Sequence, residues 1–219
     1  MKSEKVSSIQ IDAATEHLLD SDEKLADIIS DIGYCDIRPE VKGFSALARS
    51  IMSQQLSKFA AQSIYQRLVS LCGDKDITPE SLYNKTEVEL RSVGLSRSKV
   101  EYLKGLAGLA LSGQIDFRDL ESMGDESVIQ KLTQIKGVGQ WTAEMYLMFS
   151  MNRLDVFPID DVAIRNAMTM VYDIPKDDFD AQAQIIAEKW KPYRTIACWY
   201  LYRYLDTYRN IRSNKDNTL

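Results

Sequence analysis

Apolar side chains recur at three- and four-residue spacing along most of the 219-residue chain, and no convincing stretch alternates apolar with polar positions. The first spacing is typical of amphipathic helices, whereas alternation would indicate strands. The pattern therefore predicts an all-α fold, in which the acid-rich first helical segment packs onto the C-terminal half. Helices are expected over residues 9–32 (as one or two), 44–71, 87–93, 96–111, 128–135, 141–150, 160–172, 179–190 and 193–208.

Polar residues mark several helix boundaries. The run Ser-Gln-Gln-Leu-Ser at residues 53–57 interrupts the apolar stripe of residues 44–71. A break is expected there, with Ser57 as the N-cap of the second part. Thr78 followed by Pro79 predicts another helix start, because proline fits the first helical position.

Composition limits the class of protein. The three cysteines, Cys35, Cys72 and Cys198, lie far apart, which is typical of free thiols in a reducing compartment and rules out a four-cysteine iron–sulfur cluster. His17 is the single histidine, which speaks against a zinc site made of histidine and cysteine. Because no run of about 18 apolar residues and no secretory signal occurs, a soluble, intracellular protein without a membrane partner is expected.

The charge distribution is uneven. The net charge of −5 by itself argues against a nucleic-acid-binding protein. Residues 1–40 are rich in acids, however, whereas residues 189–215 carry seven bases and a single acid. This asymmetry predicts that one side of the protein faces DNA.

Residues 132–143 read Leu-Thr-Gln-Ile-Lys-Gly-Val-Gly-Gln-Trp-Thr-Ala. The two glycines allow the backbone to turn sharply, and good helix formers follow from Trp141 onward. The exposed amides at such a helix start, together with the helix dipole, can bind a DNA phosphate without a basic side chain. The hairpin residues expected to contact DNA are Gly137, Val138, Gly139, Gln140 and Thr142.

Five segments occur in the order found in a known family. They are residues 49–57, 93–99, 132–143, 157–165 and 190–194. Over residues 44–204 the chain resembles the helix-hairpin-helix (HhH-GPD) DNA glycosylase superfamily, and its 3-methyladenine DNA glycosylase II (AlkA-like) branch in particular. The resemblance implies a two-lobed all-α fold with the active site between the lobes. Residues 43–150 would form a six-helix barrel lobe that contains the hairpin, and residues 1–42 with 151–219 would form the second lobe.

The resemblance assigns the catalytic role to Asp161. Cleavage of a glycosidic bond in DNA builds positive charge on the deoxyribose, which a nearby carboxylate stabilises. The alternative is that Asp160 and Asp161 merely cap the helix that starts at Val162. We expect Asp161 to be catalytic and Asp160 to be the cap.

The resemblance also suggests a base pocket. Trp141 stands where bifunctional relatives carry the lysine that attacks the sugar, so a monofunctional enzyme is expected. Trp141 and Tyr202 are candidate walls of a pocket that attracts the positively charged ring of an alkylated purine. For both residues the alternative is ordinary core packing.

Other DNA contacts follow from the resemblance. Gln55, or its neighbour Leu56, would enter the space left by the extruded nucleotide. The alternative is that Gln55 is a buried or solvent-facing residue at the helix break without a role in DNA binding. A second phosphate-contact turn would include Gly94, Ser96 and Lys99, where the alternative is an ordinary helix C-cap. The backbone carbonyls of Thr133, Ile135 and Val138 would hold a monovalent cation.

These expectations converge on a monofunctional glycosylase that removes alkylated purines, such as 3-methyladenine and 7-methylguanine, from double-stranded DNA by base flipping. It is expected to act as a monomer and to need no cofactor beyond the monovalent cation. Two alternatives remain at this point. One is a non-catalytic helix-hairpin-helix DNA-binding module, and the other is a bifunctional glycosylase/lyase for oxidised bases.

Overall fold

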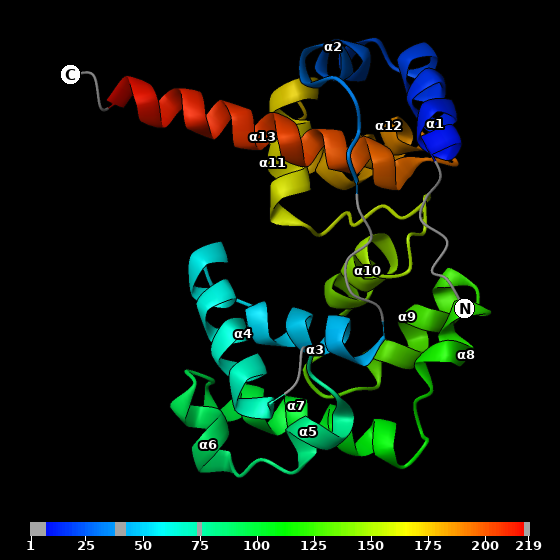
Figure 1. Ribbon diagram of the computed structural model, residues 1–219. Helices are drawn as coiled ribbons and strands as arrows, with labels where there is room; N and C mark the ends of the chain where they lie inside the picture. Colours follow the sequence, from blue (N-terminus) through cyan, green and yellow to red (C-terminus); the bar gives the residue numbers. More distant parts are fainter. Residues whose placement is uncertain (1–7, 38–42, 74–75, 217–219) are drawn as a thin grey trace. The chain divides into compact units, whose positions relative to one another are not determined.

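The computed structural model describes residues 8–37, 43–73 and 76–216 of the chain. Within these ranges the regular structure is helical and no β-strand occurs, which confirms the predicted all-α class. The described residues form two compact units (Figure 1). Unit 1 combines Met1–Pro39 with Asn152–Leu219, and unit 2 is Glu40–Met151.

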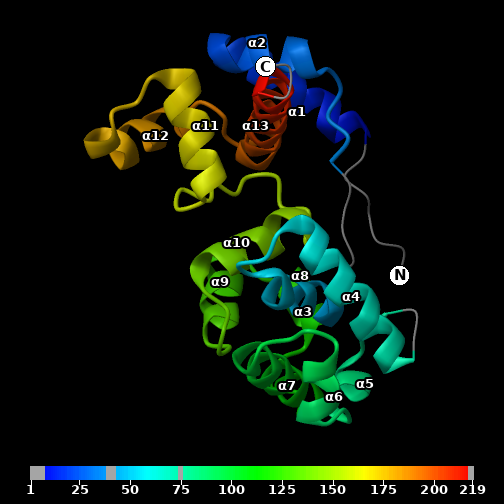
Figure 2. The same cartoon turned by 90° about the vertical axis from the view of Figure 1, so that its left-hand side faces the viewer.

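Unit 1 is organised around its last helix. Its elements are α1 (Ser8–Ser21), α2 (Glu23–Ile32), α11 (Val162–Tyr172), a short 3-10 helix (Lys176–Asp178), α12 (Phe179–Glu188) and α13 (Arg194–Asp216). Helix α13 contacts α1, α2 and α11, and it lies between the α1–α2 pair and α11 (Figure 2). The N-terminal helices thus pack onto the C-terminal half of the chain, as their pattern of acids and apolar residues predicted.

A buried carboxylate joins the two ends of the chain within unit 1. Asp22 caps α2 by accepting a hydrogen bond from the backbone N–H of Leu25 (3.1 Å). Its other oxygen accepts hydrogen bonds from the Tyr172 hydroxyl and the Trp190 indole N–H, both at 2.9 Å. Burial of a charged group is tolerated when hydrogen bonds replace the lost water. Asp22 therefore ties α2 to the end of α11 and to the turn before α13.

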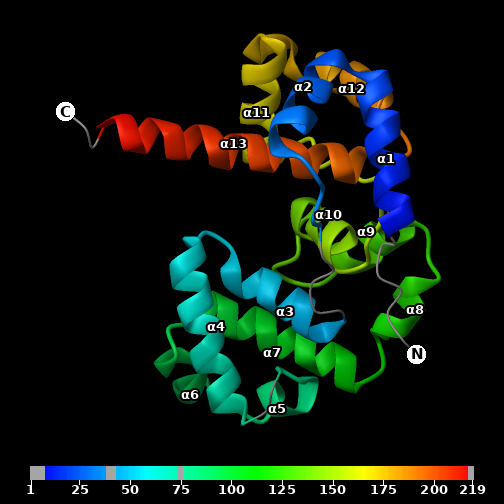
Figure 3. The ribbon, with the colours of Figure 1, turned by 45° about the horizontal axis from the view of Figure 1, so that its top comes forward.

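Unit 2 is built around α3. Its helices among the described residues are α3 (Phe44–Ser53), α4 (Lys58–Cys72), α5 (Pro79–Tyr83), α6 (Glu87–Ser92), α7 (Arg97–Leu111), α8 (Phe117–Glu121), α9 (Asp125–Thr133) and α10 (Gln140–Phe149). Helix α3 is buried over most of its length and lies beside α4, α7 and α10 (Figure 3). The predicted N-caps are confirmed: Ser57 accepts from the N–H of Ala60 (3.3 Å), and Thr78 accepts from that of Ser81 (3.1 Å).

The sequence pattern missed α8 and misplaced some helix ends. Helix α8 has five residues and starts after Asp116, whose carboxylate accepts from the N–H of Arg118 (2.8 Å). So short a helix shows no helical periodicity, and only its cap could have revealed it. Helix α13 continues to Asp216, eight residues beyond the predicted end. Its C-terminal turns extend past the other helices of unit 1 (Figure 1), so no apolar stripe is needed there.

The three cysteines form no disulfide, and all three are buried. Burial raises the pKa of the Cys35 thiol to about 11, which keeps it protonated. No helix in the described ranges is long and apolar enough to cross a membrane. Part of the charge asymmetry noted in the sequence falls on residues 1–7 and 38–42 and on side chains beyond Tyr208, which lie outside the described residues.

Candidate active site and DNA interface

The predicted hairpin connects α9 to α10 through six residues, 134–139. Gly137 has a φ of +89°, and a Cβ at this position would lie 2.3 Å from Cδ2 of Tyr102. The backbone conformation and the close ring therefore both exclude a larger residue. Gly139 differs: its φ is −91°, and a Cβ there would meet no atom within 4 Å. Of the two hairpin glycines, only Gly137 is required by the geometry of the turn.

The start of α10 offers backbone amides to an anion. Gly139 is the N-cap residue and supplies no side-chain hydrogen bond, and both Gly139 and Gln140 are exposed. The first amides of an α-helix have no acceptor within the helix, so they can bind phosphate oxygens. The N–H of Val138, by contrast, donates to the Ile135 carbonyl (3.0 Å) within the turn. Thr142 is 3% exposed, so a contact with DNA would use its backbone N–H.

Gln54 lies next to the hairpin and was not singled out from the sequence. Its side-chain amide donates to the carbonyl of Gly137 (2.9 Å) and to the hydroxyl of Thr142 (3.1 Å). The ammonium of Lys99 donates to the backbone carbonyl of Gln54 (2.7 Å), and partial burial lowers the pKa of Lys99. Lys99 therefore has a hydrogen-bond partner within the protein, besides the phosphate contact predicted from the sequence. Nothing in the sequence could reveal contacts between residues 45 to 88 positions apart.

Gln55 and Leu56, the candidates for the wedge that would fill the space left by the extruded nucleotide, lie in the loop between α3 and α4, which we call the wedge loop. Gln55 is exposed and has a φ of +58°, which is uncommon for a residue other than glycine. Leu56 is 36% exposed, and its N–H donates to the Ser53 carbonyl (3.1 Å). Both residues are exposed, so both remain candidates for insertion into DNA.

The second candidate turn precedes α7. Gly94 has a φ of +104° and donates its N–H to the Arg91 carbonyl (3.0 Å), as expected for a turn at a helix end. Ser96 caps α7 by accepting from the N–H of Lys99 (3.3 Å). The exposed start of α7 is compatible with a phosphate contact, which stays a prediction.

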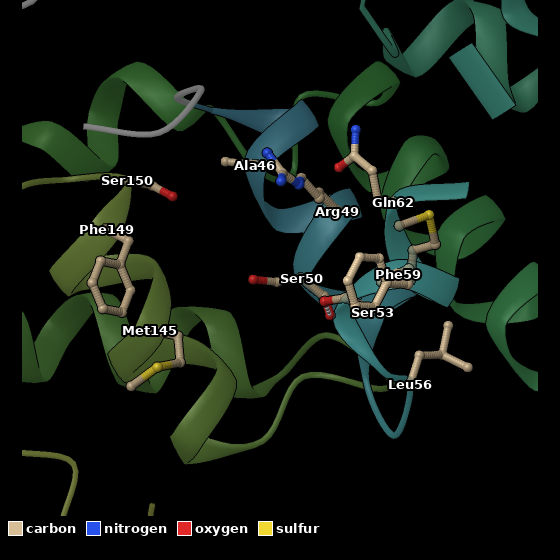
Figure 4. Close-up of a pocket in the computed structure, with 12 residues that line it drawn as sticks. Ala46, Arg49, Ser50, Ser53, Leu56, Phe59, Gln62, Met145, Phe149 and Ser150 are labelled. Atoms are coloured by element: carbon tan, nitrogen blue, oxygen red, sulfur yellow. Dashed lines mark hydrogen bonds between the residues drawn. The ribbon is translucent and has the colours of Figure 1, made fainter. Parts of the chain in front are cut away.

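A cavity of about 730 Å³ opens in unit 2 between α3, the start of α4 and α10 (Figure 4). Met145 and Phe149 of α10 lie on one side and Ser50 of α3 on the other. The remaining lining residues are Ala46, Arg49, Met52, Ser53, Leu56, Phe59, Ala61, Gln62 and Ser150. The wall thus combines apolar side chains with a few polar ones, namely three serine hydroxyls, Arg49 and Gln62, a common composition for ligand pockets. The sequence pattern did not reveal this cavity, because the lining residues come from different helices.

Trp141 lies in the first turn of α10, on the helix face that also carries Met145 and Phe149. It does not line the cavity, but Trp141, Met145 and Phe149 follow one another at four-residue spacing and therefore share a helix face. Trp141 is 42% exposed, which excludes ordinary core packing. Tyr202, on α13 of unit 1, is partly buried, whereas its neighbour Tyr200 is fully buried and donates to the Gly33 carbonyl (3.1 Å).

Asp161 is the N-cap of α11. Its carboxylate accepts from the N–H of Ile164 (2.9 Å) and the residue is 7% exposed. The expectation that Asp160 would be the cap was therefore wrong: Asp160 is exposed, and the helix begins one residue after Asp161. Capping does not exclude catalysis, because the hydrogen bond from Ile164 fixes the orientation of the carboxylate.

The irregular segment before Asp161 is fixed by the start of α13. The Thr195 hydroxyl donates to the Arg153 carbonyl (2.7 Å) and accepts from the N–H of Val156 (3.0 Å). Arg194 forms a bidentate ion pair with the carboxylate of Asp155, with nitrogen–oxygen distances of 2.7 and 3.1 Å. These contacts give a physical role to the start of α13, where the family-like segment 190–194 ends.

Arg165 supports the same region from α11. Its guanidinium lies 2.6 Å from the carboxylate of Asp180 and 3.4 Å from the carbonyl of Ile159, two residues before Asp161. The segment that leads to Asp161 is therefore held from both α11 and α13.

A monovalent cation at the hairpin remains a prediction. The Ile135 carbonyl already accepts the N–H of Val138, but a carbonyl oxygen has a second lone pair that can bind a cation. Within the described ranges, no three His, Cys, Asp or Glu side chains cluster as a metal site.

Comparisons with known proteins identify the family. Residues 48–192 match the family model described as "HhH-GPD superfamily base excision DNA repair protein". The chain is 34% identical over 196 residues to "Alkylbase DNA glycosidase-like protein mag2" of Schizosaccharomyces pombe, covering 87% of this chain and 92% of the relative. It is 38% identical over 162 residues to DNA-3-methyladenine glycosylase 1 of the same yeast, covering 73% and 71%.

Solved structures agree with this result. A crystal structure of DNA-3-methyladenine glycosidase from Bacillus halodurans has 36% sequence identity and a TM-score of 0.80, over 90% of this chain and 91% of that one. The S. pombe 3-methyladenine DNA glycosylase Mag1, in complex with abasic DNA, has 35% identity and a TM-score of 0.78, over 87% and 95%. The chain therefore belongs to the HhH-GPD superfamily of base excision DNA repair proteins.

Proposed function

We propose that the protein is a monofunctional DNA-3-methyladenine glycosylase. It hydrolyses the N-glycosidic bond of alkylated purines in double-stranded DNA and leaves an abasic site. The observation that carries the proposal is the exposed indole of Trp141 at the start of α10, the position at which, by the family resemblance, lyases carry their lysine. Indole cannot form a Schiff base with the sugar, so water is the nucleophile.

Asp161 supplies the charge stabilisation in this proposal. As the bond to the base lengthens, positive charge develops on the deoxyribose, and a carboxylate held beside it lowers the barrier. The hydrogen bond from the Ile164 N–H and the anchoring of the preceding segment by Thr195 keep this carboxylate in one orientation. An orientation fixed before the reaction avoids the cost of reorganising the carboxylate during it.

The substrate class follows from the base that has to leave. The rings of 3-methyladenine and 7-methylguanine carry a positive charge, which both weakens the glycosidic bond and attracts an aromatic face such as that of Trp141. The described cavity of unit 2 is lined by apolar and hydroxyl side chains and by Arg49 and Gln62, but by no carboxylate or histidine. A neutral base that needs protonation would find no acid there, so charged lesions are favoured.

The partner in this proposal is duplex DNA, which the enzyme binds as a monomer inside the cell. The hairpin amides at Gly139 and Gln140 hold the backbone of the DNA, while the wedge loop replaces the extruded nucleotide. No divalent metal takes part in the reaction.

The substrate assignment is tested with a panel of oligonucleotide duplexes that each contain one lesion. The released base is quantified by chromatography for 3-methyladenine, 7-methylguanine and 8-oxoguanine. We expect the two charged bases to be released much faster. Trp141→Ala should slow their release by about tenfold, because a desolvated cation–π contact is worth roughly 1–2 kcal/mol. Faster release of 8-oxoguanine would refute the alkylpurine assignment.

The monofunctional mechanism is tested by borohydride reduction during the reaction. A lyase forms a Schiff base with the DNA, which borohydride traps as a covalent adduct. We expect no adduct, and unchanged activity in EDTA. The hairpin lysine Lys136 is paired with Glu101 (2.6 Å), which favours this outcome. A trapped complex on a denaturing gel would show that another amine attacks the sugar.

A further inference from the structure

Three segments that the sequence associates with DNA meet at one residue, Gln54. Gln54 begins the wedge loop that contains Gln55 and Leu56, and it is the C-cap residue of α3. Its side-chain amide bridges to the hairpin at Gly137 and Thr142, at 2.9 and 3.1 Å.

The third segment joins through the backbone of the same residue. The carbonyl of Gln54 accepts from the ammonium of Lys99 (2.7 Å), which lies in the first turn of α7, directly after the second candidate phosphate-contact turn. The segments lie 45 and 83 to 88 positions apart along the chain. Gln54 is therefore the point at which the wedge loop is tied to both candidate phosphate-binding turns.

The wedge loop needs such support. Gln55 has a φ of +58°, and a non-glycine residue in this conformation is held there by its surroundings at a cost of about 1 kcal/mol or more. Gln55 and Leu56 are both exposed and gain little from packing. A loop without anchors would lose this conformation and would have to be ordered again during each extrusion of a nucleotide.

The chemistry of the anchor is specific to an amide. The carbonyl of Gly137 can only accept a hydrogen bond, so the group opposite it must donate. The NH₂ group of Gln54 donates to this carbonyl and to the Thr142 hydroxyl. A glutamate of the same size would place a carboxylate against the carbonyl and lose that bond. The hairpin partner is itself rigid, because the Tyr102 ring packs against Gly137.

We propose that Gln54 is a positioning residue for base extrusion: it holds the wedge loop in register with the phosphate-binding hairpin, so that binding of the DNA backbone and displacement of the base occur as one event. This inference rests on the proposed glycosylase function. Gln54 itself contacts no base in this proposal. It determines where Gln55 and Leu56 stand when the hairpin binds the backbone.

The test compares two substrates for wild type, Gln54→Glu and the control Gln114→Ala, which alters an exposed glutamine between α7 and α8. One substrate has 7-methylguanine in a stable base pair. The other has it unpaired in a single-nucleotide bulge, where extrusion costs little. We expect Gln54→Glu to lower kcat/KM on the paired lesion by about tenfold, the effect of about one hydrogen bond, and to leave the bulged lesion within about twofold of wild type. Gln114→Ala should match wild type on both.

A second variant keeps the test decisive if Gln54→Glu does not fold. Thr142→Val keeps the shape of the buried side chain and removes one of the two acceptors of Gln54. It should shift the ratio of paired to bulged activity in the same direction, by about threefold, since it removes a single neutral hydrogen bond. If Gln54→Glu melts below the assay temperature, this ratio for Thr142→Val decides the question.

The outcomes separate the two proposals. Equal losses on both substrates, or unchanged activity on the paired lesion, overturn the positioning role of Gln54 while the glycosylase function stands. If the wild type releases no base from either substrate, the proposed function is wrong and the inference that rests on it falls as well.

Discussion

The hairpin of unit 2 and the segment before Asp161 in unit 1 differ in what defines their backbone. The turn of the hairpin is formed by local backbone features, namely a positive φ at Gly137, a hydrogen bond from the Val138 N–H to the Ile135 carbonyl and a helix start without a side-chain cap, and Gln54 then bonds to this turn from a distance. Residues 152–161 have no regular structure, and side chains 39 to 42 positions away hold them through Thr195 and Arg194. The conformation of the hairpin turn can thus arise locally, whereas the irregular segment that leads to the candidate catalytic carboxylate is held by distant residues.

The largest effect on activity is expected at the candidate catalytic carboxylate. Asp161→Asn should lower base release by about 100-fold or more, because it removes the charge that stabilises the transition state. Asparagine is as good an N-cap as aspartate, so the melting temperature should stay near that of wild type. Binding to lesion DNA should be nearly unchanged, since the hairpin is intact. Single-turnover base release and DNA titration measure the two effects.

Asp160→Asn is the matched control for this prediction. Asp160 is exposed and is not the cap, so its substitution should change release by less than about threefold, as expected for a surface residue. Equal losses in the two variants would show that the wrong carboxylate has been assigned.

The two glycines of the hairpin should separate stability from DNA affinity. In Gly137→Ala the new Cβ would lie 2.3 Å from the Tyr102 ring in a backbone conformation that disfavours alanine. We expect a loss of about 2–4 kcal/mol in the free energy of unfolding, together with weaker binding to every duplex.

Gly139→Ala meets no atom within 4 Å, so the free energy of unfolding should change by less than about 1 kcal/mol. Its Cβ still hinders the approach of a phosphate to the amides, and affinity at low salt should fall for damaged and undamaged duplexes alike. Chemical denaturation and direct titration distinguish the variants. Unchanged affinity in Gly139→Ala would show that the phosphate binds elsewhere.

Thr195→Val tests whether distant support matters for the catalytic segment. The buried hydroxyl donates to the Arg153 carbonyl and accepts from the Val156 N–H, and Thr195→Val removes both of these hydrogen bonds. We expect a loss of about 1–3 kcal/mol in stability and a clear fall in kcat, with DNA affinity retained. Unchanged kcat in a variant that is destabilised would mean that the segment before Asp161 needs no anchor for catalysis.

Alkaline pH gives the smallest effect, and it acts on unit 1. The pKa of Cys35 is raised from 9.0 to about 11 by burial, so the thiol ionises more easily in the unfolded chain. Its contribution to stability is fully present below pH 9 and is lost as the pH rises from 9 to 11, by about 1 kcal/mol at pH 10. Urea denaturation at pH 7.5 and pH 10 measures this loss, which should be smaller in Cys35→Ala. An equal pH effect in that variant would assign the loss to other groups.

Several local features of the fold could be predicted because their signals are short. The caps at Ser57 and Thr78, and the glycine at 137, involve residues within a few positions, and the structure has them as predicted. The choice between Asp160 and Asp161 as the cap could not be made in this way. Both residues suit a cap, and the start of α11 is set by the turn in which the Asp161 N–H bonds to the Pro158 carbonyl.

The sequence by itself determined the all-α class, most helices and the glycine hairpin, because helical periodicity and turn chemistry are local properties of the chain, whereas the candidate carboxylate came from the family resemblance. The tertiary structure decided what surrounds them: the partners of Gln54, the buried Asp22, the anchoring of residues 152–161 and the cavity between α3 and α10. These features join residues tens to more than a hundred positions apart. Such contacts form only when the helices pack, and no local pattern records which side chains will then meet.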